Sequence, residues 1–300
     1  MKAARFSRFG GPEVLELVDL PEPRPAAGQV RIAVRAAGVN ASDWKKRRGL
    51  MDQELPQTLG YEAAGVVDEV GEGVEDVAVG DRVYGFCLDG AAQAESAVLS
   101  FYAPIPAALD FAAAAALPAA VETAMRALDQ LGVAGGSTVL VNGASGSVGS
   151  AAVQFAVARG ARVIGTAGAA NHEHLRALGA EPVAYGEGLV ERVRALAPGG
   201  VDLALDVAGS GVLPELIGLA GGAEHVLTVA DFAGAREHGV RFSRGDDGRA
   251  LHALSEIGEL VTAGRFAVPA VTSFPLADIA QAHRVAEAGG VRGKLVLLVG

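Results

Sequence analysis

The stretch Thr138–Gly149, TVLVNGASGSVG, decides the fold of the second half of the chain. It opens with a continuous apolar run typical of a buried strand, and small residues follow. The next segment predicts a helix with one apolar face, at the spacing i, i+3, i+4, i+7 and i+8: Val148, Ala151, Ala152, Phe155 and Ala156. This order predicts a dinucleotide-binding turn, and the alternative is a plain strand-to-helix turn.

A dinucleotide-binding turn needs small residues for a tight bend, for close approach of the backbone to a pyrophosphate, and for packing of the helix on the strand. Ala144, Gly146 and Gly149 fill these three places. The helix start then offers free N–H groups and the positive end of the helix dipole. We therefore expect the turn and the first helical residues to bind the cofactor: Ala144, Ser145, Gly146, Ser147 and Val148.

The rest of the chain predicts an α/β protein with two domains. Further strand-like runs at residues 162–166, 201–207 and 225–230 alternate with helical segments, which is typical of a Rossmann fold, a doubly wound parallel sheet. Before this region, short β-rich runs at 29–36 and 64–70 alternate with turn residues and predict a mostly-β domain. A length of 300 residues agrees with two domains.

Composition narrows the class of protein. The chain has 35 acidic and 25 basic residues and a net charge of −10, so its field repels phosphate backbones and anionic lipid, and we expect neither a nucleic acid nor a membrane as partner. We find no secretory signal and no apolar run long enough to span a bilayer. A single cysteine, Cys87, excludes an internal disulfide and favours a cytoplasmic location.

The second predicted strand of the sheet indicates which dinucleotide binds. A free ribose 2′-hydroxyl is usually held by an acidic residue about 20 residues after the turn. Residues 162–172 contain no carboxylate, which favours NADPH over NADH, because a 2′-phosphate meets no repulsion there. The candidates to contact that phosphate are Thr166, Asn171, His172, Arg176 and Tyr185. Asn171 has an alternative role as the N-cap of the next helix.

Several stretches resemble the zinc-independent branch of the medium-chain dehydrogenase/reductase superfamily, the quinone oxidoreductases related to zeta-crystallin. They run in family order through nearly the whole chain: AAGVNASDWKKRRG (36–49), LPQTLGYEAAGVV (55–67), GDRVYGF (80–86), GAAQAES (90–96), ALPAAVETAMRAL (116–128), VNGASGSVG (141–149) and RGKLVLLV (292–299). The resemblance implies a GroES-like catalytic domain, residues 1–118 completed by 265–300, and a Rossmann NADPH-binding domain, residues 119–264. It also implies a cleft between the domains for nicotinamide and substrate, and a homodimer.

The resemblance also argues against zinc. The zinc-dependent branch has a cysteine after AAGV and a histidine in a Gly-His-Glu motif, where this chain has Asn40 and Tyr61. An amide and a phenol are poor zinc ligands compared with a thiolate and an imidazole, so we expect no metal. The pair His172 and His174 is expected to be solvated, because positions two apart on a helix do not face each other.

Three residues are candidates for catalysis. In the family the position of Asn40 lies near the nicotinamide, so its amide could bind a substrate oxygen or orient the ring, and the alternative is a turn asparagine satisfied within the protein. Lys45, where some quinone reductases have a tyrosine, could bind or protonate an oxyanion, or belong to a solvated basic face with residues 46–48. Tyr61 could donate a proton or pack in the core. The resemblance implies that Thr123 lies at a helix start near the carboxamide of the cofactor. Asp43 is expected to cap a helical turn, and the alternative is a role as general acid.

These features predict an NADPH-dependent, zinc-free oxidoreductase that transfers a hydride to a small molecule, a quinone or a related activated carbonyl such as an enone. One alternative is an enoyl or alkenal reductase, which uses the same cofactor. A second is a non-enzymatic protein that binds NADPH as a sensor or for structure.

Overall fold

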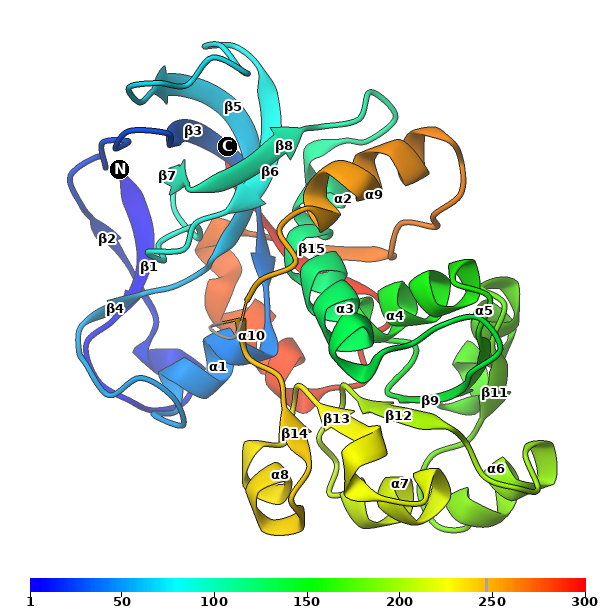
Figure 1. The fold of residues 1–300 in the computed structure, drawn as a ribbon. Coiled ribbons are helices and arrows are strands. Elements are labelled where there is room, and N and C mark those ends of the chain that lie inside the picture. Colours follow the sequence, from blue (N-terminus) through cyan, green and yellow to red (C-terminus); the bar gives the residue numbers. More distant parts are fainter. Residues whose placement is uncertain (246–247) are drawn as a thin grey trace. The chain divides into compact units, whose positions relative to one another are not determined.

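The computed structural model describes residues 1–245 and 248–300 and divides them into two compact units (Figure 1). Unit 1 comprises Met1–Ala119 and Leu254–Gly300, and unit 2 comprises Ala120–Ala253. The sequence predicts a return to the first domain at residue 265, but unit 1 resumes at Leu254. The helix α9 (Ala253–Thr262) accounts for the difference, because the Tyr84 hydroxyl in unit 1 donates to the Leu254 carbonyl at 2.7 Å.

Unit 1 is a mostly-β fold of the GroES-like type, as predicted. Its seven-stranded sheet has the order β15-β16-β3-β5-β6-β8, with β7 also paired to β3. The strands are β3 (Val30–Val39), β5 (Glu62–Val70), β6 (Arg82–Phe86), β7 (Ser96–Leu99), β8 (Phe101–Pro104), β15 (Val271–Pro275) and β16 (Lys294–Leu298). A three-stranded sheet has the order β2-β1-β4, formed by β1 (Lys2–Phe6), β2 (Glu16–Asp19) and β4 (Gln57–Thr58).

The C-terminal strand β16 is an integral part of unit 1. It pairs with β3 in antiparallel register, from Leu295 opposite Val39 to Leu298 opposite Ala36. Apolar residues of this sheet and of the helix α10 (Ile279–Ala288) form one core cluster. The remaining helices of unit 1 are α1 (Ala41–Arg47) and α2 (Phe111–Ala115).

Unit 2 has the predicted Rossmann fold. Its six parallel strands have the order β11-β10-β9-β12-β13-β14. They are β9 (Thr138–Asn142), β10 (Arg162–Thr166), β11 (Glu181–Val183), β12 (Leu203–Asp206), β13 (Val226–Thr228) and β14 (Arg241–Phe242). The chain runs outward from β9 in one direction and from β12 in the other, so the strand order reverses between these two strands, the place where such sheets bind ligands.

Helices cover both faces of this sheet. Figure 1 draws α4 and α5 above it and α6 and α7 below it. The helices of unit 2 are α3 (Pro118–Leu131, which starts at the unit boundary), α4 (Ser147–Ala158), α5 (His172–Ala177), α6 (Leu189–Leu196), α7 (Leu213–Ala220) and α8 (Phe232–His238). The predicted apolar face of α4 packs inward, with Ala151, Ala152, Phe155 and Ala156 buried.

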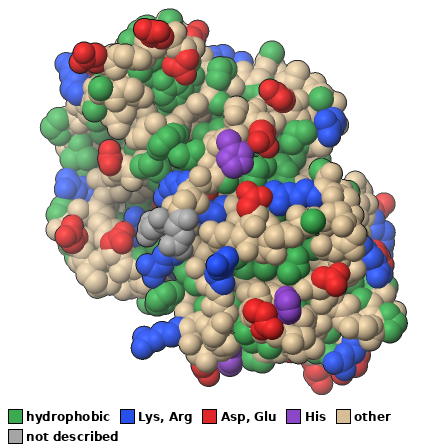
Figure 2. Space-filling view, viewed as in Figure 1, with side chains coloured by type: hydrophobic (Ala, Val, Ile, Leu, Met, Phe, Trp, Pro, Cys, Tyr) green, Lys and Arg blue, Asp and Glu red, His purple; other side chains and the backbone are tan. Residues whose placement is uncertain are grey.

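One helical stretch, Phe111–Leu131, has the length and apolar character of a membrane span. The structure buries 78% of that window inside the protein, as in a core helix, so it is weak evidence for a membrane segment. On the face that Figure 2 shows, acidic and basic side chains are interspersed.

Candidate functional site

The turn between β9 and α4 has the geometry that a dinucleotide-binding turn requires. Gly143 has a φ of +85°, in the left-handed region that favours glycine. A Cβ on Gly149 would lie 2.2 Å from the Gly143 carbonyl oxygen, so only glycine lets α4 pack this closely on the turn. A Cβ on Gly146 would lie 3.6 Å from the same oxygen, an ordinary contact. Gly149 therefore serves the packing of the helix, whereas a Cβ on Gly146 would meet nothing closer than this ordinary contact.

The start of α4 leaves backbone donors free for an anion. Gly146 is the N-cap, and the Ser150 N–H donates to the Gly146 carbonyl at 2.8 Å. The N–H groups of the preceding helical residues, Ser147 to Gly149, have no carbonyl one turn back to accept them. Together with the positive end of the helix dipole they suit an anion at the carboxyl ends of the strands. Contact of Ser145, Gly146, Ser147 and Val148 with a cofactor stays a prediction. Ala144 is fully buried and its N–H donates to the Thr166 carbonyl at 3.0 Å, so its contact with a cofactor also stays a prediction.

A chain of buried polar side chains joins the carboxyl ends of four neighbouring strands. The Thr166 hydroxyl donates to Asn142 Oδ1 at 2.7 Å, and Asn142 Nδ2 donates to Asp206 Oδ1 at 2.9 Å. On the other side, the Thr228 hydroxyl donates to Asp206 Oδ2 at 2.7 Å. We call these four residues the strand-end chain. The sequence patterns assign no role to Asn142, Asp206 or Thr228, because only the strand order places them side by side.

The strand-end chain also holds the loops that follow the strands. Thr166 Oγ1 accepts from the Gly143 N–H at 3.0 Å, and Asp206 Oδ1 accepts from the N–H groups of Ala208 and Gly209, each at 3.0 Å. Thr166 is only 1% exposed. The structure thus gives its hydroxyl a role inside the sheet edge, fixing the turn, rather than the free position that contact with a 2′-phosphate would require.

The other candidates for the 2′-phosphate lie beyond the ends of β10 and β11. His172 Nε2 lies 3.1 Å from the Ala167 carbonyl oxygen, and Asn171 occupies the N-cap position of α5 without a side-chain capping bond. Arg176 is exposed on α5. The Tyr185 side chain is 65% exposed, and its hydroxyl lies 3.8 Å from the position of a Cβ on Gly168. Contact of these four residues with a phosphate stays a prediction.

Thr123 lies on α3 beside a buried ion pair. Its hydroxyl lies 3.4 Å from Glu122 Oε2, and Arg126 Nε donates to Glu122 Oε1 at 2.7 Å. The same carboxylate oxygen accepts from the Ala250 N–H at 3.1 Å. These bonds fix the turn of α3 that carries Thr123, whose contact with a cofactor carboxamide stays a prediction.

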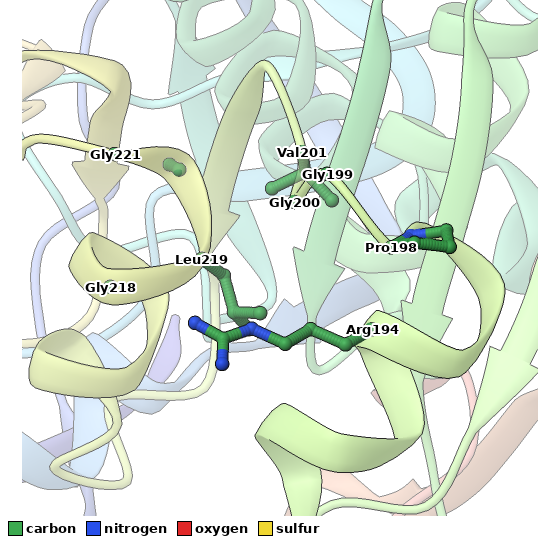
Figure 3. Close-up of a pocket in the computed structure, with 9 residues that line it drawn as sticks. Arg194, Pro198, Gly199, Gly200, Val201, Gly218, Leu219 and Gly221 are labelled. Carbon is green, nitrogen blue, oxygen red and sulfur yellow. The ribbon is translucent and has the colours of Figure 1, made fainter.

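A cavity of about 300 Å³ opens in unit 2 at the amino ends of the sheet strands, opposite the dinucleotide-binding turn (Figure 3). Its walls are the end of α6, the residues before β12 and the end of α7, and Figure 3 shows the Arg194 side chain reaching toward Leu219. It lies at the amino end of β12, whereas the dinucleotide-binding turn follows the carboxyl end of β9. This cavity is therefore not the expected cofactor site.

In unit 1, buried charged side chains surround the position of Asn40. Lys294 Nζ donates to Asn40 Oδ1 at 2.5 Å and to Glu62 Oε1 at 2.6 Å, and Asn40 Nδ2 donates to the same Glu62 oxygen at 2.6 Å. Glu62 is fully buried, Lys294 is 3% exposed, and Asn40 is partly exposed. We call these three residues the Asn40 triad. Glu62 and Lys294 were not predicted as site residues, although both stand in the stretches that carry the family resemblance.

The surroundings of the triad hold it in place. The second oxygen of Glu62 accepts from the Ala119 N–H at 2.7 Å. A Cβ on Gly38 would lie 2.3 Å from Glu62 Oε1, so glycine makes room for the carboxylate. Asp43 accepts from the Asn40 N–H at 2.7 Å and caps the start of α1, as predicted. Burial raises the pKa of Asp43 to about 6, against the opposing effect of the Asn40 hydrogen bond and of the Lys294 charge.

The other two catalytic candidates have aromatic neighbours. The Tyr61 ring is half-buried and stacks on Phe86, with centroids 6.5 Å apart and an angle of 6° between the planes. This contact supports the packing alternative. Lys45 is half-buried, with its Nζ 5.8 Å from the centroid of the Trp44 ring. A catalytic role for Tyr61 or Lys45 stays a prediction.

The solvated basic face proposed for residues 45–48 is wrong at Arg47. This side chain is fully buried and pairs with Glu287 at 2.6 Å, while its other nitrogens donate to the Gly10 carbonyl and to His283 Nδ1. Burial, followed by the Arg47 charge, lowers the pKa of His283 to about 3. The reason is helical geometry: Arg47 lies on the face of α1 that packs against α10.

The residues at the Asn40 position do not fit a zinc ion. No group of three or more His, Cys, Asp or Glu side chains that could hold a metal occurs in residues 1–245 and 248–300. At Asn40, an ammonium group already occupies the space beside the amide oxygen and the Glu62 carboxylate. A divalent cation there would be repelled by Lys294 and would find neither thiolate nor imidazole.

Comparisons with known proteins agree with this architecture. Residues 26–125 match the family described as alcohol dehydrogenase GroES-like domain, and residues 178–297 match the family described as zinc-binding dehydrogenase. The chain is 34% identical over 334 aligned positions to the quinone oxidoreductase of Lama guanicoe, covering 100% of this chain and 98% of the relative.

Two further comparisons extend the likeness. The quinone oxidoreductase of Rattus norvegicus is 44% identical over 174 residues, and this alignment spans 56% of the chain and about half, 53%, of the relative. The structure of Escherichia coli quinone oxidoreductase complexed with NADPH superimposes with a TM-score of 0.85 at 26% identity, with full coverage of both chains. The chain therefore belongs to the medium-chain dehydrogenase/reductase superfamily, among the relatives of the quinone oxidoreductases.

Proposed function

We propose that this protein is an NADPH-dependent, zinc-free oxidoreductase that reduces a quinone or a related activated carbonyl. The observation that carries the proposal is the turn between β9 and α4, where Gly149 lets the helix pack on the turn and Gly146, which has no side chain, precedes the free backbone N–H groups of the helix. This arrangement suits the pyrophosphate of a dinucleotide.

The choice of NADPH rests on the end of β10. Residues 162–172 bring no carboxylate to the expected place of the ribose, and the exposed side chains of Arg176 and Tyr185 follow. A guanidinium suits the 2′-phosphate that distinguishes NADPH from NADH. The superimposed enzyme from Escherichia coli was solved with NADPH, which supports the same choice here.

When bound, NADPH supplies a hydride, which is a proton with two electrons. Reduction of a quinone then balances as NADPH plus quinone plus one proton giving NADP⁺ plus hydroquinone. The protein must orient the acceptor and stabilise the negative charge that develops on its oxygen. Asn40 is the proposed donor to that oxygen, since its amide nitrogen has a second N–H beyond the one given to Glu62. The proton comes from solvent or from a titratable neighbour.

Paired titrations with NADPH and NADH, followed by cofactor oxidation with benzoquinone and with cyclohexenone, test the proposal. We expect tighter binding of NADPH and oxidation that depends on benzoquinone. In Arg176→Met, the affinity for NADPH should fall about tenfold, the equivalent of one exposed charged contact, while that for NADH stays constant. Arg194→Met, at the opposite edge of the sheet, is the matched control and should change neither affinity.

Each other outcome indicates a different function. A preference for cyclohexenone would identify a reductase of conjugated double bonds, for which the same cofactor site serves. Tight NADPH binding without oxidation by either acceptor would favour a sensor or structural role. Tighter binding of NADH would contradict the inference from the end of β10, and stoichiometric zinc in elemental analysis would contradict a zinc-free site.

A further inference from the structure

We infer that Lys294 is a positioning residue that locks the Asn40 amide with its N–H, and not its carbonyl oxygen, available to the substrate. The effect of Lys294 on catalysis rests on the proposed function. The fixed orientation of the Asn40 amide depends only on the contacts within the Asn40 triad. It also narrows the substrate class to acceptors that present an oxygen lone pair, such as quinones and carbonyl compounds.

The first step is the occupancy of the amide. Asn40 Oδ1 accepts from the Lys294 ammonium at 2.5 Å, and Asn40 Nδ2 donates one N–H to the Glu62 carboxylate at 2.6 Å. Both bonds involve a charged group and are shorter and stronger than neutral hydrogen bonds. The amide oxygen is thus occupied by a buried cation, while the second N–H of Nδ2 is free of these two partners.

The second step is the cost of the opposite orientation. If the amide turned by half a rotation, its NH₂ group would face the ammonium of Lys294 and its carbonyl oxygen would face the carboxylate of Glu62. Two favourable charged contacts would become two unfavourable ones at the same distances. Because Glu62 and Lys294 are almost fully buried, water cannot screen these contacts. The two charges therefore fix one orientation of Asn40.

The third step is that the surrounding protein fixes the two charges themselves. Lys294 Nζ lies 2.6 Å from Glu62 Oε1, and the second Glu62 oxygen accepts the Ala119 N–H. Gly38 leaves no side chain between the carboxylate and β3. Lys294 itself begins β16, which pairs with β3 immediately before Asn40. The triad is thus built on paired strands, a rigid base for a partly exposed amide.

The consequence is a fixed hydrogen-bond donor at a site where zinc-dependent relatives hold a metal ligand. A fixed N–H stabilises negative charge on a substrate oxygen without reorganisation during the reaction. An N–H donor cannot accept the proton that an alcohol substrate must lose from its hydroxyl group. The site is therefore suited to reduction of a carbonyl or quinone oxygen.

Steady-state kinetics of three variants test this inference. Lys294→Met removes the charge and should lower kcat with benzoquinone by about tenfold to a hundredfold, the usual cost of a misplaced catalytic group, while the Kd for NADPH changes less than twofold. Lys294→Arg keeps a cation and should restore part of the activity. Lys2→Met removes an exposed lysine paired with Asp19 and is the matched control, with unchanged kinetics.

A double variant separates positioning from stability. Lys294→Met leaves Glu62 buried without a counter-charge, which itself destabilises the fold. Glu62→Gln combined with Lys294→Met removes both charges, so we expect the melting temperature to recover while kcat stays low, because the amide then has no fixed orientation. Recovery of kcat together with the melting temperature would show that Lys294 only supports the fold and would overturn the inference.

A spectroscopic measurement keeps the inference testable apart from the activity. The side-chain NH₂ of Asn40 is identified in a ¹⁵N–¹H spectrum by its loss in Asn40→Asp. In the wild type we expect one of its two protons to be shifted downfield by Glu62 and protected from exchange with solvent, and Lys294→Met should remove both effects. Wild-type protein without quinone reductase activity would refute the proposed function, whereas an Asn40 signal indifferent to Lys294→Met would refute the positioning role.

Discussion

Replacement of Gly146 by alanine separates cofactor binding from folding. Gly146 is the N-cap of α4, with φ −73° and ψ 172°, a conformation open to any residue. The nearest heavy atom to an added Cβ is the Gly143 carbonyl oxygen at 3.6 Å. The methyl group therefore fits the free protein, and we expect the free energy of unfolding to change by less than about 1 kcal/mol.

The same methyl group would stand where a pyrophosphate must approach. The backbone N–H groups after Gly146 reach a phosphate oxygen only if it comes within about 3 Å, and a methyl group in front of them holds it back by roughly an ångström. Each hydrogen bond to a charged group contributes about 1.5–3 kcal/mol. Loss of one such bond should weaken NADPH binding about tenfold to a hundredfold.

Isothermal titration calorimetry gives the Kd, and thermal unfolding of the free protein gives the stability. Gly149→Ala is the informative contrast, because its Cβ would lie 2.2 Å from the backbone of Gly143, so both affinity and melting temperature should fall. Gly218→Ala, within α7 and without any atom within 4 Å of its Cβ, is the control. It should leave the affinity unchanged and raise the stability by up to about 1 kcal/mol through helix propensity.

The reasoning would be refuted by a Gly146→Ala protein that binds NADPH as tightly as the wild type, within twofold. That result would mean that the pyrophosphate does not approach the turn at this residue. A drop in melting temperature as large as that of Gly149→Ala would instead contradict the ordinary contact of 3.6 Å expected for the new Cβ at residue 146.

Three further predictions concern the stability of the two units. Asp206→Ala leaves the two buried donors Asn142 and Thr228 and two partly buried backbone N–H groups without their acceptor, so the free energy of unfolding in urea should fall by at least about 3 kcal/mol, and a fall below about 1 kcal/mol would contradict the central place of Asp206 in the strand-end chain. Arg47→Met should lower the free energy of unfolding by about 3–5 kcal/mol, because it removes a buried partner of Glu287. Replacement of the exposed Arg48 by Met should lower it by less than about 1 kcal/mol, and equal effects of the two substitutions would exclude the buried pairing. The pKa of His283 is about 3 in the folded protein and 6.5 in the unfolded chain. Between pH 3 and 6.5 the unfolded chain therefore carries a proton on this residue that the folded protein does not. The contribution of His283 to the free energy of unfolding is complete above pH 6.5 and decreases below it by up to about 1.4 kcal/mol per pH unit. Urea unfolding at pH 7.5 and about 5.5 measures this decrease. We expect a smaller decrease in His283→Asn than in the wild type.

Local patterns in the sequence predict the elements that form from contiguous residues. β9 and β10 have the predicted bounds, because each is an unbroken apolar run between turn residues. β12 and β13 lie inside the predicted ranges but are shorter, since the end residues of those runs belong to the loops. β14 was not predicted, because two residues carry no periodic signal.

The candidate site likewise contains residues that local sequence predicts and residues that only the fold brings together. The dinucleotide-binding turn is local, and the roles of Gly146 and Gly149 follow from their spacing between a strand and a helix. The Asn40 triad joins residues that are up to 254 positions apart, so no spacing rule could find it. The hydrogen bond from Thr166 to Asn142 was missed for a similar reason, because Asn142 lies on the neighbouring strand.

The order of unit 1 along the chain has a consequence for synthesis on the ribosome. Lys294 reaches Glu62 across 232 positions, and all of unit 2 lies between the two parts of unit 1. A nascent chain therefore completes the contiguous six-stranded sheet of unit 2 before β16 has been synthesised, while Glu62 still lacks its counter-charge. During that interval residues 36–39 of β3, which later pair with β16, are open to other strands, which is a risk of aggregation. β16 therefore both completes the pairing of β3 and neutralises the buried carboxylate.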